Sequence, residues 1–179
     1  MAKNKAFYFS FLLTLLWFSA AGAGHLRDQV AATYSGQVGV REATGRNDGP
    51  QVKMYLASVN LKQGYAWCGA FVNWVYRQHN IKGPAGAAMA NAWFTKARTV
   101  WRRGDPEAFH AEKADVFGIY YPGLKRIGHV GFVEKWDHGS DVVITVEGNT
   151  NGAGSREGNG VYRKRRLKSQ IYAVADWIT

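Results

Sequence analysis

The sequence predicts an α+β domain in which N-terminal helices pack on an antiparallel β-sheet. Residues 26–60 carry apolar side chains at helical spacing, and the segment GYAWCGAFVNWVY (64–76) places Phe71, Trp74 and Val75 on one face of a further helix. Later in the chain, short runs rich in β-branched and aromatic residues alternate with glycine-bearing turns. Helices followed by strands favour an α+β fold over alternating βαβ units.

Local signals set the bounds of the helices. Pro50 suits the first position of a helix, because the N–H that proline lacks would be unpaired there in any case. Gly83 and Pro84 end the helix that carries Cys68, because neither residue continues a helix well. Cys68 itself lies in or just before the first turn. We therefore expect helices over about 26–34, 50–59 and 68–82, and a short one around 88–99.

Five runs in the second half of the chain read as strands, and the second and third form a hairpin. The three residues DHG (137–139) suit a loop whose glycine adopts the left-handed conformation. In that register Trp136 faces Ser140, and His129 lies directly opposite Glu147 on the same face of the sheet. A slip of one residue would put the two side chains on opposite faces. The expected strands are 114–122, 128–136, 141–149, 160–166 and 171–178.

Cys68 is the single cysteine of the chain, so it has no disulfide partner within it. A lone cysteine is often a small buried hydrophobe. At a helix N-terminus, however, unpaired N–H groups and a nearby imidazolium both stabilise the thiolate. A histidine held by a carboxylate keeps one ring nitrogen free to serve such a nucleophile. Cys68, His129 and Glu147 therefore predict the arrangement of papain-like enzymes, which is recognised by the roles of its residues.

The segments GYAWCGAFVNWVY, GHVGFVEKW and VEGNT resemble the three signature blocks of the CHAP family, the cysteine, histidine-dependent amidohydrolases and peptidases that cleave bacterial peptidoglycan. The resemblance covers roughly residues 36–165. It implies a papain-like α+β fold with Cys68 as the nucleophile and His129 as its base and acid. It also implies that Glu147 orients His129, that Asn149 is a supporting polar group, and that peptidoglycan is the substrate.

Residues near the cysteine are candidates for secondary roles. The oxyanion of an acyl-transfer reaction needs hydrogen-bond donors, and the backbone N–H of Cys68 is the first candidate. Gln63 and Tyr65 are candidates for the second; Gln63 is suggested by papain-like enzymes, which use a glutamine a few residues before the cysteine. Trp67 and Trp93 are candidates for lining a substrate groove.

The sequence predicts no cofactor and no metal site. The histidines outside the candidate site show no metal-ligand spacing, and a single cysteine excludes a cysteine-rich zinc site. Some CHAP proteins bind calcium near the cysteine, but the chain has no EF-hand-like spacing. The glycine-rich stretch 148–160 lacks the Gly-Lys-Ser/Thr ending of a phosphate-binding loop, so we expect a hairpin loop there.

Residues 1–23 have the order of a secretory signal peptide, with two lysines, an apolar run and small residues ending in AGA. We expect cleavage after Ala23, a secreted or periplasmic protein, and one catalytic domain over 24–179. The alternative is an uncleaved anchor, since residues 6–24 are almost long enough to span a bilayer.

Removal of Lys3 and Lys5 with the leader lowers the formal net charge from +10 to +8. Such a charge attracts anionic surfaces, including anionic cell-wall polymers. The basic cluster RKRR (163–166) with Lys168 is either such a binding surface or the solvated face of a strand. A non-catalytic polyanion-binding module is therefore the rival function, although no nucleic-acid docking motif is present. We expect a monomer that binds no nucleic acid. The scissile bond is either the N-acetylmuramoyl-L-alanine amide or a peptide bond.

Overall fold

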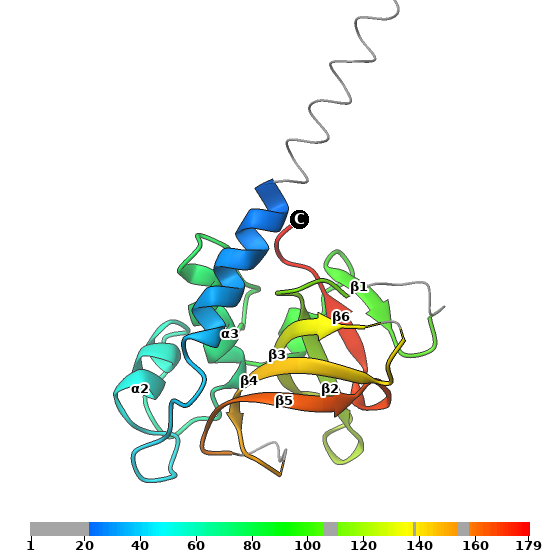
Figure 1. Cartoon of the computed structure of the whole chain (residues 1–179). Helices are drawn as coiled ribbons and strands as arrows, with labels where there is room; N and C mark the ends of the chain where they lie inside the picture. Colours follow the sequence, from blue (N-terminus) through cyan, green and yellow to red (C-terminus); the bar gives the residue numbers. More distant parts are fainter. Residues whose placement is uncertain (1–21, 106–110, 138, 154–157) are drawn as a thin grey trace, which may run out of the picture.

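The computed structural model describes residues 22–105, 111–137, 139–153 and 158–179, and within them three α-helices pack on a six-stranded sheet (Figure 1). All strand pairs are antiparallel, in the order β1-β6-β2-β3-β4-β5. The helices are the N-terminal helix (22–35), α2 (Pro50–Ala57) and α3 (Cys68–Arg77). The strands are β1 (Thr99–Arg102), β2 (Val116–Tyr121), β3 (Arg126–Trp136), β4 (Val142–Thr150), β5 (Gly160–Leu167) and β6 (Ala173–Ala175).

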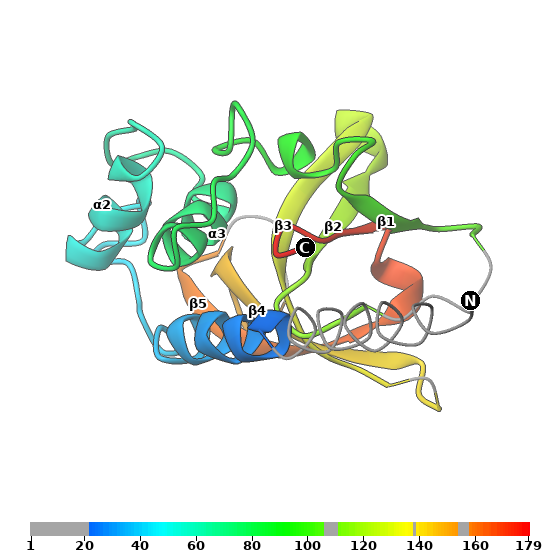
Figure 2. The same ribbon diagram turned by 90° about the horizontal axis from the view of Figure 1, so that it is seen from above.

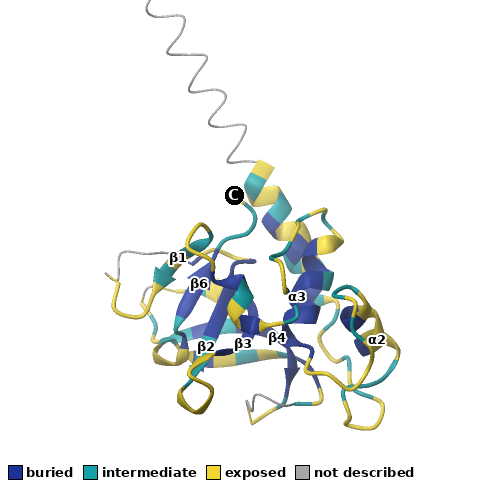
Figure 3. Cartoon of the chain, turned by 180° about the vertical axis from the view of Figure 1, so that it is seen from behind, coloured by how far each residue is buried: buried dark blue, intermediate teal, exposed yellow. Residues whose placement is uncertain are grey.

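Helix α3 packs against β3 and β4, while α2 lies farther from the sheet and packs against α3 (Figures 1 and 2). Phe132 of β3 is the centre of this contact. Its ring lies 4.8 Å from Tyr34 of the N-terminal helix, 6.0 Å from Phe71 and 5.2 Å from Tyr76, measured between centroids. Helix α3 and the strands behind it are accordingly buried (Figure 3). This packing fixes the start of α3 against the middle of the sheet.

The predicted fold class is confirmed, and each of the five expected strand runs contains a strand. Three local expectations are wrong. Helix α3 ends at Arg77, before Gly83 and Pro84, because Asn80 adopts a left-handed backbone (φ 58°) that closes the helix. The helix expected around 88–99 is only the short 3-10 helix Ala90–Trp93, and Thr99–Arg102 forms an additional edge strand beside β6. Alternate residues of that strand are exposed, which is the period-two pattern of a half-buried strand.

The register of the β3–β4 hairpin also differs from the prediction. Trp136 pairs with Val143 instead of facing Ser140, and a bulge lies between Val133 and Lys135. The loop between Trp136 and Val142 is longer than the predicted three residues. Two of its polar side chains form hydrogen bonds with backbone N–H groups: Asp137 Oδ1 accepts one from Gly139, and Ser140 Oγ accepts one from Val142. The shift is three residues at Trp136, and the bulge reduces it to two at Phe132. His129 and Glu147, which lie beyond the bulge, therefore keep their predicted common face.

Nearly all of the expected leader, residues 1–23, lies outside the described residues. The described part of the N-terminal helix is tied to the domain by Arg27, whose guanidinium pairs with Asp115 at 2.7 Å and with Asp176 at 2.9 Å. Across residues 22–105, 111–137, 139–153 and 158–179, none of the helices has the length and apolar character needed to cross a bilayer.

Candidate active site

Asn149 fixes the start of the helix that carries Cys68. Its Oδ1 accepts a hydrogen bond of 3.0 Å from the backbone N–H of Trp67, the residue before Cys68. Its Nδ2 donates to Asn47 Oδ1 and to the carbonyl oxygen of Gly158, both at 3.0 Å. Asn149 adopts a left-handed backbone (φ 56°), a conformation that asparagine tolerates better than most residues. It therefore positions the helix terminus.

Strands β3 and β4 bring His129 and Glu147 together. Nε2 of His129 lies 2.9 Å from Oε2 of Glu147, and both side chains are fully buried. Continuing the register of Phe132 with Val146 places Gly131 beside Glu147, so His129 is its diagonal neighbour. A Cβ atom on Gly131 would lie 2.9 Å from Glu147 Cγ. The missing side chain thus makes the space through which Glu147 reaches the histidine.

Arg166 and Thr145 complete the shell of Glu147. Nε and Nη2 of Arg166 donate to the two carboxylate oxygens, each at 2.6 Å, and Thr145 Oγ1 donates to Oε1 at 2.5 Å. Sequence reasoning missed both residues and placed Arg166 in a cluster of surface charges. An electrostatic argument could have found Arg166, because a carboxylate buried as Glu147 is needs a buried cation as its partner.

The imidazole of His129 connects Glu147 to Cys68. Its second nitrogen, Nδ1, is buried and has no partner in standard hydrogen-bond geometry within the described residues, which leaves it available to the thiol. Burial alone would raise the pKa of Cys68. The interaction with His129 and the backbone N–H groups of Val130 and Gly69 lower the pKa below its ordinary value. The site thus favours a thiolate.

His129 is protonated in this site, and Glu147 is ionised. Burial alone would lower the pKa of His129, but Cys68 and Glu147 raise the pKa to about 9. Burial alone would raise the pKa of Glu147, but hydrogen bonds from Arg166 and His129 lower the pKa to about 2. At neutral pH His129 is therefore an imidazolium and Glu147 a carboxylate, and the lowered pKa of Cys68 favours a thiolate beside the imidazolium. Cys68 is buried, with 5% of the residue exposed.

The candidates for oxyanion donors lie upstream of the helix. Gln63 and Tyr65 are both exposed. Gln63 Oε1 accepts a hydrogen bond of 3.0 Å from Gly49 N–H, which ties the glutamine side chain to the loop before α2. The first N–H groups of α3 have no partners further up the helix, so the N–H of Cys68 stays the first candidate.

The two tryptophans expected in a substrate groove are fully buried, so the structure does not support that role. Trp67 packs beside Tyr55 and donates its indole N–H to Glu42 Oε1 at 2.8 Å. Trp93 donates its indole N–H to the carbonyl oxygen of Ala87 at 2.9 Å. Both rings find their polar partner inside the domain, as buried tryptophans usually do.

Most of the basic cluster is occupied within the domain. Arg163 forms a two-pronged ion pair with Glu134 at 2.7 and 2.8 Å, Arg166 holds Glu147, and Lys164 donates to carbonyl oxygens of the preceding loop. Arg165 is exposed. The cluster is therefore a weaker argument for polyanion binding than its density in the sequence suggests. Among the described residues no group of histidine, cysteine and carboxylate side chains could hold a metal ion.

A cysteine at the start of a helix, packed on an antiparallel sheet that carries a histidine–glutamate pair, defines the papain-like class of α+β folds. The sequence model of the CHAP domain matches residues 60–149, half of the chain, and the protein belongs to the CHAP family. This family consists in general of amidase- and peptidase-type hydrolases. No curated protein and no solved structure matches the chain. The matched range includes Cys68, His129, Glu147 and Asn149, while Arg166 lies beyond it.

Proposed function

We propose that the protein is a peptidoglycan hydrolase that cleaves amide bonds with Cys68 as its nucleophile. The observation that carries this proposal is the buried His129, which contacts ionised Glu147 through Nε2, interacts with Cys68 and has no other partner for Nδ1 among the described residues. Peptidoglycan is the substrate class that the CHAP family suggests. We further propose that the protein acts outside the cytoplasm, after removal of residues 1–23.

Acylation follows from the charges of the site. The Cys68 thiolate attacks the amide carbonyl carbon, and the carbonyl electron pair moves onto oxygen. The imidazolium of His129 then gives its Nδ1 proton to the leaving nitrogen as the C–N bond breaks, which releases an amine and leaves a thioester. Glu147 stabilises the imidazolium and holds the ring in place. The backbone N–H of Cys68 donates to the oxyanion.

Deacylation reverses the proton path. Neutral His129 takes a proton from water, and the hydroxide attacks the thioester carbon. The C–S bond breaks, the sulfur leaves as thiolate, and the product is a carboxylic acid. The imidazolium is restored beside the thiolate, which regenerates the starting charges. The scissile amide is either the sugar–peptide junction or a bond within the peptides.

The test is hydrolysis of purified peptidoglycan by the mature chain and by its Cys68→Ala variant. We expect the parent to clear the substrate in a zymogram and the variant to bind the substrate without clearing it. Mass spectrometry of the released fragments then identifies the bond from its new amine. Because Cys68 is the chain's single cysteine, one equivalent of iodoacetamide should also abolish clearing. Clearing by Cys68→Ala at the parent rate would end the proposal.

A further inference from the structure

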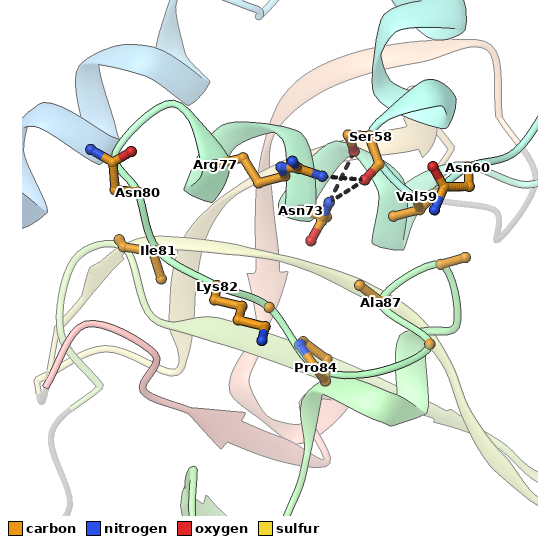
Figure 4. A pocket seen from close by; sticks show the side chains of 13 residues that line it. Ser58, Val59, Asn60, Asn73, Arg77, Asn80, Ile81, Lys82, Pro84 and Ala87 are labelled. Carbon is orange, nitrogen blue, oxygen red and sulfur yellow. Dashed lines mark hydrogen bonds between the residues drawn. The ribbon is translucent and has the colours of Figure 1, made fainter.

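A cavity of about 580 Å³ lies along the flank of α3, between the residues that follow α2 and the loop 80–88 (Figure 4). Its volume is in the range of small-ligand sites, which run from roughly 300 to 1,000 Å³. The cavity is separate from the Cys68–His129–Glu147 constellation, because none of these three residues lines it. The proposed mechanism does not use this cavity.

The wall formed by α3 offers a hydrogen-bond acceptor, Asn73 Oδ1, to this cavity. Asn73 is 6% exposed, and its Nδ2 donates to the carbonyl oxygen and to Oγ of Ser58 at 3.0 and 3.1 Å. Its Oδ1 makes no hydrogen bond among the described residues, and Figure 4 shows this oxygen turned away from Ser58, toward the loop. An amide oxygen that lines a cavity can accept a hydrogen bond from an N–H or O–H group of a ligand.

The charged groups of the lining are all positive. Arg77 stands on α3, where its Nη1 donates to the Ser58 carbonyl oxygen at 3.1 Å, and Lys82 stands on the facing loop (Figure 4). The lining contains no aspartate or glutamate. Two cations on facing walls favour an anionic group between them, and an arginine in particular suits the planar carboxylate.

The cavity adjoins the nucleophile through Gly69, the residue that follows Cys68. A Cβ atom on Gly69 would lie 2.4 Å from the carbonyl oxygen of Ala87 and 2.6 Å from that of Ala88. Both alanines line the cavity. Gly69 therefore packs against the loop that lines the cavity, and the helix that carries Cys68 also lines the cavity through Asn73 and Arg77.

We infer that this cavity is a substrate subsite that holds a peptide bearing a free carboxylate, of the kind found in peptidoglycan stems. Lys82 and Arg77 bind the carboxylate, and Asn73 Oδ1 accepts a peptide N–H. This assignment rests on the proposed function for the identity of the peptide. It gives the enzyme a means to choose carboxylate stems over stems whose carboxylates are amidated.

The test uses the Cys68→Ala protein, which binds without turnover, in titration calorimetry. The probes are a synthetic stem tripeptide with free carboxylates and the same peptide with carboxamides. We expect the carboxylate peptide to bind about tenfold more tightly, and Lys82→Glu to abolish that preference. Lys135→Glu makes the same charge change on β3, outside the cavity lining, and should leave both affinities unchanged.

Three results would overturn the assignment: equal affinity for the two peptides, no measurable binding of either, or equal weakening by Lys82→Glu and Lys135→Glu. Competition by inorganic phosphate at the concentration of the peptide would also overturn it, because the cavity would then be a general anion site. The outcome is independent of the catalytic test. Hydrolysis by Cys68→Ala refutes the proposed function, whereas binding that ignores the carboxylate refutes only the subsite.

Discussion

The burial of Arg166 follows from the charges of single residues in the site. A thiolate on Cys68, an imidazolium on His129 and a carboxylate on Glu147 together carry one net negative charge. A buried net charge is costly unless an opposite charge pairs with it. Arg166 supplies that charge through two hydrogen bonds to Glu147. It is a positioning residue, because it acts on the histidine through the carboxylate.

Replacement of Arg166 by methionine should change the pH dependence of hydrolysis. Arg166 lowers the pKa of Glu147, so Glu147 in the variant takes up its proton at a higher pH. Protonated Glu147 no longer stabilises the imidazolium, and the thiolate is lost with it. We expect the acid limb of kcat/KM to move upward by roughly one pH unit. The alkaline limb should stay near the His129 pKa of about 9, and activity against pH on soluble peptidoglycan fragments measures both limbs.

Two further variants separate this role from a general effect on folding. Arg166→Lys keeps the charge and loses the two-pronged geometry, so it should lower kcat while the acid limb stays in place. Arg165→Met removes a neighbouring exposed charge and should behave as the parent. If Arg166→Met only reduces the amount of folded protein and both limbs match the parent, Arg166 has no part in positioning Glu147.

At the scale of elements, the site depends on how β3 and β4 pair. Glu147 reaches His129 across the position of Gly131, where a Cβ atom would also lie 3.0 Å from a ring carbon of Phe117. Both strands are buried here, so the crowding cannot be relieved toward solvent. The pair of strands therefore requires glycine at this position for the diagonal contact.

The substitution Gly131→Ala tests that requirement. The added methyl group should displace Glu147, reduce kcat/KM by about tenfold and lower the free energy of unfolding by about 1–3 kcal/mol. Activity assays and urea unfolding measure the two effects. Gly123→Ala is the matched control, since no atom lies within 4 Å of the added Cβ there. A fully active Gly131→Ala protein would mean that Glu147 reaches His129 by a route that does not need this space.

The sequence was sufficient to predict that the histidine and the carboxylate of the site share one face of the sheet. Alternation along the strands placed His129 and Glu147 on one side, and this holds because a shift of two residues preserves the face. It could not predict the register itself. The hairpin connection is set by hydrogen bonds of Asp137 and Ser140 and by a bulge in β3, which depend on the folded geometry.

Tertiary context also decided which polar and aromatic side chains are buried. Arg166 belongs to a run of four basic residues, and the sequence does not show that this one faces Glu147 while Arg165 faces solvent. Trp67 adjoins the cysteine, so a groove was a reasonable expectation, but Glu42 from a distant loop supplies its indole partner inside the domain. Such long-range partners are invisible in local patterns.

At the scale of the whole molecule, one buried ion-pair cluster joins the two ends of the domain. Arg27 of the N-terminal helix contacts Asp115 just before β2 and Asp176 just after β6. Cleavage after Ala23 would leave Arg27 in the mature chain. The helix also supplies Tyr34 to the core, where its ring stacks on Phe132. The first helix is therefore part of the domain that holds the site.

Replacement of Arg27 by methionine should destabilise the whole domain in a pH-dependent way. Burial raises the pKa of Asp115 to about 6 even though Arg27 lowers it, so loss of Arg27 raises it further. Above that pH the variant carries an unpaired buried carboxylate, and we expect a loss of about 3 kcal/mol in the free energy of unfolding. Protonation of Asp115 relieves the cost, so the deficit should shrink as the pH falls from the raised pKa of Asp115 in the variant to the parent value of about 6. Urea unfolding of the parent, of Arg27→Met and of the exposed control Arg165→Met at pH 5 and pH 8 measures this difference. A deficit that is equal at both pH values would show that packing of the Arg27 side chain, and not its charge, stabilises the domain.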